Sequence, residues 1–291
     1  MKNIFKQLSS VFVLMLMSAT VTAQSINIPD TLDGWDQSWV ASLNGSQAAY
    51  NNWSQGGVSS ISGTGSSILT LKYRQGLFSY GFRTNLKYGQ SNIKGQGVRK
   101  TDDVIELINR FNYMFSEGSN WSGYGNINFR TQFDKGYDYS TEDGVPDVLI
   151  SDFLAPAYIM EGVGLAFDPG SGLTFEAGLA LKQTIVNDDS LKSLYNVAQD
   201  KNIRGEGGLT TGINFEKEVF ENILYTSSLE TFTNFLIPVS ETDVKWGNEL
   251  VGQINSLVSA SFQFELRYDN DFSSEVQLKQ VLSAGISVNL Y

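Results

Sequence analysis

Apolar and polar residues alternate at every second position through most of the chain. In the stretch LTFEAGLALK, which begins at Leu173, the odd-numbered residues are apolar, whereas Glu176 and Lys182 fall on the other face. Residues 78–88 and 258–268 repeat this pattern. Period-two alternation is typical of β-strands with one apolar and one polar face. The chain is therefore predicted to be all-β.

Extended over the whole chain, the alternation predicts about twelve strands. Their expected ranges are 39–48, 66–74, 77–89, 103–115, 121–134, 153–167, 173–183, 203–216, 223–235, 244–254, 257–268 and 277–290. A strand that crosses the hydrocarbon core of a membrane at a tilt needs about 9 to 11 residues. Most of the expected strands are long enough for such a crossing.

The connections between these strands alternate in length. Short connections are expected at 74–76, 116–120, 168–172, 217–221 and 255–256, and longer polar ones at 51–57, 91–100, 135–152 and 186–202. An up-and-down barrel in an outer membrane has short turns on the periplasmic side and longer loops outside. We therefore expect a single up-and-down antiparallel transmembrane β-barrel of about twelve strands.

Aromatic residues at the expected strand ends favour the same interpretation. They include Trp39, Tyr73, Tyr88, Phe115, Trp121, Phe133, Phe167, Trp246 and Tyr268. Transmembrane barrels carry aromatic girdles at both membrane interfaces. A soluble β-sandwich would show the same strand alternation, because it buries the apolar faces of two sheets against each other. A secreted soluble β-domain therefore stays open as an alternative.

The first 23 residues have the pattern of a secretory signal peptide. Lys2 and Lys6 precede a short apolar run, and small residues lead up to Ala23, after which cleavage is expected. The remaining chain is divided into a periplasmic arm at 24–38 and a barrel at 39–291. The expected location is the outer membrane of a Gram-negative bacterium, and the expected partners are outer-membrane lipid and the barrel-insertion machinery.

Charge and missing residue types exclude several classes of function. The formal charge of −11 becomes −13 when the two lysines of the signal are removed, so nucleic acid is not an expected partner. The chain has no histidine and no cysteine, which removes the commonest general base, the commonest metal ligand and all thiolate chemistry. We expect neither an enzyme nor a cofactor.

Several short motifs resemble an uncharacterised outer-membrane β-barrel family of Bacteroidota-type bacteria, domain of unknown function 3078. The resemblance is carried by Asn52–Gly57 (NWSQGG), Tyr88-Gly89, Arg99–Asp103 with Ile105–Leu107, Phe129–Phe133, and Gly136-Tyr137. It implies a barrel in the outer membrane and no particular activity. One departure is that Tyr291 is out of phase with the apolar alternation of the last expected strand.

The polar faces of the expected strands carry charges of both signs. The candidates for the barrel lumen are Arg83, Lys87, Glu106, Arg110, Arg130, Glu176, Lys182, Arg204, Glu206, Glu230, Lys245, Glu249, Glu265 and Arg267, with Lys279 on the last strand. They could form a selective pore lining. They could also form ion pairs that bridge neighbouring strands and fill a narrow interior, which the near balance of signs favours.

Two polar connections contain further candidates. The loop motif Asn52, Trp53, Gly56 and Gly57 suits either a ligand platform or a turn with Trp53 at the membrane surface, and the turn is favoured. Weak calcium candidates are Asp138, Glu142, Asp143 and Asp147, but their spacing departs from that of an EF-hand loop. A solvated acidic loop is the favoured interpretation, so no metal site is expected.

Three functional hypotheses follow from the sequence. The leading one is a passive outer-membrane channel or transporter for a small polar solute. The second is a closed structural or assembly barrel that partners other envelope components. The third is the secreted soluble β-domain, in which Trp53 would be a ligand platform.

Overall fold

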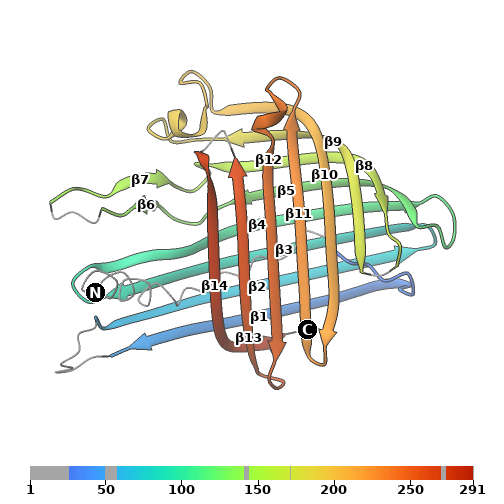
Figure 1. The fold of residues 1–291 in the computed structure, drawn as a ribbon, viewed down its shortest axis with the longest axis horizontal. Helices are drawn as coiled ribbons and strands as arrows, with labels where there is room; N and C mark the ends of the chain where they lie inside the picture. Colours follow the sequence, from blue (N-terminus) through green and yellow to red (C-terminus); the bar gives the residue numbers. More distant parts are fainter. Residues whose placement is uncertain (1–25, 50–57, 141–143, 171, 270–272, 291) are drawn as a thin grey trace, which may run out of the picture.

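The fold is a single closed β-barrel, shown as a computed structural model in Figure 1. The structure describes residues 26–49, 58–140, 144–170, 172–269 and 273–290. Its strands are β1 (Gly34–Ala48), β2 (Ser60–Gln75), β3 (Phe78–Ile93), β4 (Gly97–Met114), β5 (Trp121–Thr131), β6 (Gly136–Asp138), β7 (Val148–Ser151), β8 (Ala157–Phe167), β9 (Leu173–Ile185), β10 (Ile203–Phe220), β11 (Ile223–Asn234), β12 (Asp243–Gln253), β13 (Val258–Asp269) and β14 (Ser273–Asn289).

Twelve of these strands form the barrel wall, in the order β1-β14-β13-β12-β11-β10-β9-β8-β5-β4-β3-β2. Every neighbouring pair is antiparallel, and β1 pairs with β14 to close the sheet. In Figure 1 the later strands, coloured orange to red, cross in front of β1 to β5 at a steep angle. Tilted strands are what closure of a sheet into a barrel requires.

The predicted fold class and the twelve wall strands are confirmed, with differences of several residues at some of their boundaries. The first strand begins at Gly34 rather than at Trp39, so part of the expected arm belongs to the wall. The expected long loop at 91–100 is a tight turn instead, since β3 continues to Ile93 and β4 begins at Gly97. Gly95 and Gly97 have positive φ angles there, which lets the chain reverse without a longer loop.

The remaining elements lie in three connections at one end of the barrel. The hairpin of β6 and β7 belongs to the connection between β5 and β8, and the 3₁₀ turn η1 (Lys192–Tyr195) belongs to the connection between β9 and β10. A second 3₁₀ turn, η2 (Val239–Glu241), follows β11. In the described part of the chain, no helix is long and apolar enough to cross a bilayer.

The outward face of the wall is apolar. On β8 and β9, Val163 lies opposite Leu179, and both side chains are more than half exposed, at 64% and 55%. Leu165 and Leu181 extend the same surface. Soluble monomers rarely expose a continuous apolar surface of this kind. The wall therefore has the amphipathic character predicted from the sequence, with its apolar face outside.

Aromatic side chains gather at both ends of this outer face. At the short-turn end, Trp35 contacts Tyr73 with ring centroids 4.9 Å apart, and Tyr80 lies 6.5 Å from Trp35. At the opposite end, the ring of Tyr88 lies 6.5 Å from that of Phe133. Two aromatic zones separated by an apolar belt are characteristic of barrels that span a membrane.

Candidate functional site in the barrel interior

The inward face of the wall is polar, and many of its charged groups are buried. Strand register places Glu106 on β4 opposite both Asn85 on β3 and Arg130 on β5, so the three residues share the inner face. Glu106 accepts a hydrogen bond of 3.3 Å from the amide nitrogen of Asn85. Charged side chains inside a barrel can be stabilised by one another or by water, because few other polar groups are within reach.

One ion pair crosses the interior between strands that are not neighbours. Arg110 on β4 donates two hydrogen bonds to Glu176 on β9, with Nη2–Oε1 at 2.7 Å and Nη1–Oε2 at 3.0 Å. The strands β5 and β8 lie between them in the wall. The guanidinium of Arg110 also stacks over the ring of Tyr124, 4.2 Å from its centroid. Such a two-pronged pair fixes both side chains across the lumen.

Two further contacts span the interior nearer the long-loop end. Lys182 on β9 donates a hydrogen bond of 2.6 Å to Asp243 on β12, and its ammonium lies 3.8 Å from Asp269 on β13. Lys279 on β14 lies 3.3 Å from Asp102 on β4. The inward charges therefore pair with one another as expected, but these pairs join strands that are not neighbours in the wall, whereas the expected pairs join neighbouring strands.

The pairs do not fill the interior, because a cavity of about 230 Å³ remains between them. Eight predicted lumen residues line it: Glu106, Arg110, Arg130, Glu176, Lys182, Glu230, Lys245 and Arg267. Cavity residues that sequence reasoning missed include Asp243, Asp269, Tyr124 and Tyr158. Asp243 could have been predicted to face the lumen from the position of Lys245, because residues two apart in a strand share a face.

Apart from Lys279, which pairs with Asp102, six predicted lumen residues are not part of the cavity lining. Arg204 pairs with Glu206 at 3.0 Å, and Glu249 accepts a hydrogen bond of 2.6 Å from Gln263. Glu265 accepts one of 3.0 Å from Arg267. Arg83 donates to Thr70 at 3.3 Å, and Lys87 is buried. These six residues therefore form contacts with other side chains of the wall or are buried in the wall around the cavity.

Residues 26–33, here called the N-terminal segment, enter the short-turn end of the barrel. Ile26 and Ile28 are buried in a cluster with Ile108, which also lines the cavity. Arg74, beside the turn between β2 and β3, donates a hydrogen bond of 2.9 Å to the carbonyl of Ile28 and pairs with Asp30 at 2.8 Å. This insertion was not predicted, because two isoleucines separated by one polar residue form too short a pattern to indicate a buried segment.

One part of the chain matches a known protein family. Residues 46–137 match the family described as "Protein of unknown function (DUF3078)". The resemblance predicted from the motifs is therefore confirmed for that range, while its bacterial group stays a prediction. No curated protein matches the sequence.

Solved structures with a similar architecture share little sequence with this chain. An outer membrane channel from Pseudomonas putida F1 aligns with a TM-score of 0.43 and 10% identity, over 90% of this chain and 98% of that one. The translocator domain of the autotransporter NalP from Neisseria meningitidis aligns with a TM-score of 0.38 and 12% identity, over 97% and 93% of the two chains.

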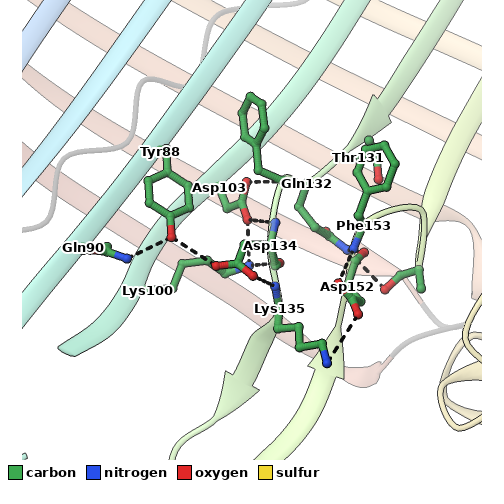
Figure 2. Close-up of polar contacts among 12 residues, drawn as sticks. Tyr88, Gln90, Lys100, Asp103, Thr131, Gln132, Asp134, Lys135, Asp152 and Phe153 are labelled. Atoms are coloured by element: carbon green, nitrogen blue, oxygen red, sulfur yellow. Dashed lines mark hydrogen bonds and ion pairs between the residues drawn. The ribbon is translucent and has the colours of Figure 1, made fainter. Parts of the chain in front are cut away.

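Some motif residues of the matched range, among them Tyr88, Lys100 and Asp103, meet at the long-loop end of the barrel (Figure 2). Asp103 accepts hydrogen bonds from the backbone N–H groups of Phe133 and Asp134, at 2.7 and 2.9 Å. Lys100 lies 2.8 Å from the Asp103 carboxylate and donates to the carbonyl of Asp134 at 2.6 Å. Tyr88 donates to the carboxylate of Asp134 at 3.3 Å. These residues fix the start of the connection between β5 and β8 to the wall.

The same connection packs against the one between β9 and β10. Ala155, Val186, Leu191, Tyr195 and Val197 form a buried apolar cluster. The Tyr195 hydroxyl donates a hydrogen bond of 2.6 Å to the carbonyl of Ile150, and burial raises the pKa of this hydroxyl. The two long connections therefore form one folded unit at the barrel end.

Some of the predicted loop sites lie partly or wholly outside the residues that the structure describes. The motif Asn52, Trp53, Gly56 and Gly57 falls there, as do Glu142 and Asp143 and the predicted signal peptide. Of the remaining calcium candidates, Asp147 accepts a hydrogen bond of 3.0 Å from the backbone of Ser140, and Asp138 lies in β6. Among the residues that the structure describes, no group of three or more potential metal ligands occurs.

Proposed function

We propose that this protein is an outer-membrane β-barrel that passively admits a small polar solute into its interior. The observation that carries the proposal is the charge-lined cavity of about 230 Å³ inside a closed barrel whose outer face is apolar. An apolar belt between aromatic zones suits lipid, and a polar interior suits a hydrated solute. The protein would act as a non-catalytic channel.

The proposed location rests on the barrel, the outer apolar belt and the signal-like N-terminal sequence. An outer-membrane barrel reaches its membrane through export and assembly, so the barrel-insertion machinery and outer-membrane lipid are its proposed partners. Fractionation of expressing Gram-negative cells tests this step. We expect the protein in the outer-membrane fraction with a heat-modifiable gel shift, whereas recovery as a soluble protein would support the secreted β-domain.

Passage of solutes is tested with the purified barrel in lipid vesicles. Vesicle swelling in isotonic solutions of small neutral and charged solutes should be faster with the barrel than with empty vesicles. Planar-bilayer recordings should show discrete conductance steps. A folded, inserted barrel that gives neither swelling nor conductance would contradict the channel.

A closed structural barrel is the second candidate, and a specific observation favours it. The ion pairs Arg110–Glu176 and Lys182–Asp243 cross the lumen, and the N-terminal segment occupies one end. Such contacts narrow the interior and stiffen the wall. This candidate predicts that the same envelope proteins co-purify with the barrel from detergent-solubilised membranes, at a fixed ratio, while vesicle permeability stays unchanged.

A further inference from the structure

Arg130 on β5 lines the cavity and, in the described part of the chain, forms no hydrogen bond or close ion pair with a protein group. Its register neighbours are Glu106 on β4 and Tyr158 on β8. Glu106 accepts a hydrogen bond from Asn85 instead. Within the described part of the chain, neither the guanidinium of Arg130 nor the hydroxyl of Tyr158 forms a hydrogen bond or ion pair. A guanidinium keeps its charge and offers five donors, so this position is suited to an anionic group of a ligand.

Other cations of the cavity differ from Arg130 in this respect. Arg110 is held by Glu176 through two hydrogen bonds, and Lys182 is held by Asp243 at 2.6 Å. Their charges are compensated within the protein. Arg130 and Tyr158 therefore stand out as cavity-lining donors without a hydrogen bond in the described part of the chain.

The cavity as a whole carries balanced charge. Its lining contains five arginines and lysines and five aspartates and glutamates. A solute with only a negative charge would meet the carboxylates of Glu230 and Asp269 as well as Arg130. A solute with both charges can place each one near an opposite charge, which favours a zwitterion.

We propose that Arg130 and Tyr158 bind the carboxylate of a small zwitterion of amino-acid type, with its ammonium group toward the acidic residues of the lining. The planar fork of an arginine matches a carboxylate, and a tyrosine hydroxyl adds one more donor. A cavity of about 230 Å³ has the volume of several water molecules, at about 30 Å³ each, and so fits a solute of this size. This inference rests on the proposed function and names its solute class.

Equilibrium dialysis of the purified full-length barrel in detergent micelles tests the site. The probes are L-alanine, propionate, which lacks the ammonium group, and glycerol, which lacks both charges. L-alanine should bind more tightly than either. Arg130→Gln should weaken L-alanine binding by about tenfold or more, as expected for loss of a charge-assisted hydrogen bond, and Tyr158→Phe by a smaller factor.

Arg99→Gln is the matched control. It also removes one guanidinium, which stacks over Tyr139, and Arg99 is not part of the cavity lining. This variant should bind L-alanine as the unchanged barrel does. Equal L-alanine binding by folded Arg130→Gln would overturn the site, and equal binding of propionate and L-alanine would overturn the zwitterion.

These experiments can reject the proposed binding site and the proposed channel function independently of each other. Conductance without Arg130-dependent binding would leave the proposed function and reject the site. Binding that depends on Arg130 without conductance would keep the site and reject the channel.

An independent inference concerns the N-terminal segment. Ile26 packs against Gly81 so closely that a Cβ atom at Gly81 would lie 2.8 Å from its side chain. On another side of the barrel, Asn27 lies 3.5 Å from the carboxylate of Glu216 on β10. Arg74 on β2 holds the carbonyl of Ile28. The segment therefore contacts the wall on separate strands at the short-turn end.

The segment lies directly beside the cavity, because Ile108 contributes to both. We infer that Ile26 and Ile28 close the short-turn end to polar solutes, since an apolar constriction resists passage of water and ions. At the outer edge of the segment, Asp30 has a side chain that is 81% exposed, whereas its partner Arg74 is only 8% exposed. The segment is therefore held in place by the buried isoleucines and by the hydrogen bond from Arg74 to the carbonyl of Ile28.

Single-channel recording of the full chain tests the closure. Ile26→Asn combined with Ile28→Asn should increase the open time or the conductance relative to the unchanged barrel. A second variant that lacks residues 26–32 leaves β1 intact, since this strand begins at Gly34. It should conduct at least as well as the double variant. Conductance that neither change increases would overturn the inference.

Thiol labelling measures the accessibility of the N-terminal segment and does not depend on the passage of ions through the barrel. The chain contains no cysteine, so a single introduced cysteine reports one position. In micelles, Ile26→Cys should react much more slowly with a charged thiol reagent than Asp30→Cys, because Ile26 is buried and Asp30 is exposed. Equal reaction rates would show that the segment does not occupy the lumen.

Discussion

Arg110 and Glu176 form a two-pronged ion pair across the barrel interior, at 2.7 and 3.0 Å, although their strands are not neighbours in the wall. Each side chain is only 15% exposed. Removal of one partner leaves a buried charge without compensation, which costs more than the net contribution of the pair. This relationship ties the stability of the barrel to the shape of its lumen.

The first prediction concerns this pair. Glu176→Gln or Arg110→Met alone should lower the free energy of unfolding by about 2–4 kcal/mol, because the remaining charge is stranded. The double variant should be less destabilised than the two single effects added together. Urea titration of the barrel in vesicles, followed by tryptophan fluorescence, measures all four proteins of the cycle. Simple additivity would show that the pair is not coupled.

A second prediction concerns the contacts of Asp103 that fix the connection between β5 and β8 to the wall (Figure 2). Asp103→Ala removes the acceptor of two backbone N–H groups, at Phe133 and Asp134, and the partner of Lys100. Each unsatisfied group costs about 1–3 kcal/mol, so the connection between β5 and β8 should open locally. Hydrogen exchange of this connection should accelerate while the wall strands stay protected.

The control for this variant is Glu117→Gln, which removes an exposed carboxylate at the opposite end of the barrel. It should leave the exchange pattern unchanged. If Asp103→Ala retained the protection of residues 132–140, the carboxylate would not be the anchor.

A third prediction concerns Gly178, which faces the lumen. A Cβ atom at Gly178 would lie 2.5 Å from the carbonyl oxygen of Val163 and 2.6 Å from the hydroxyl oxygen of Tyr124. The ring of Tyr124 supports Arg110. Gly178→Ala should therefore displace the ring and strain the pairing of β8 with β9, which destabilises the barrel by about 1–3 kcal/mol. Gly65→Ala is the matched control, since a Cβ atom there meets nothing within 4 Å. Equal unfolding midpoints of the two variants would contradict the packing argument.

A fourth prediction tests what surrounds the outer face. Glu161 on β8 is exposed on that face, with Ile127 and Leu181 as its cross-strand neighbours. In lipid, Glu161→Leu should stabilise the barrel by about 1–2 kcal/mol, because a carboxylate on the lipid face is unfavourable. The unfolding free energy in vesicles measures the effect. Glu161→Gln should give a smaller change of the same sign, and a loss of stability in both variants would argue against a lipid-facing position.

Much of the wall could be predicted from residue patterns. Alternation within stretches such as 173–182 fixes which side chains share a face, because successive residues of a strand point to opposite sides. It identified the twelve wall strands and, on their polar face, residues such as Arg110 and Glu176. Boundaries were less accurate where polar residues continued a strand, as at 91–100, since turn-forming composition and strand pairing compete there.

The sequence by itself determined the strands, the two faces of the wall and the absence of histidine and cysteine chemistry. Only the tertiary structure decided which inward charges meet, because contacts such as Lys182 with Asp243 depend on closure and strand tilt around the whole barrel. The same holds for the site at Arg130 and for Ile26 inside the lumen. Local patterns record which face a residue occupies, whereas the distance across a barrel is set by all of its strands together.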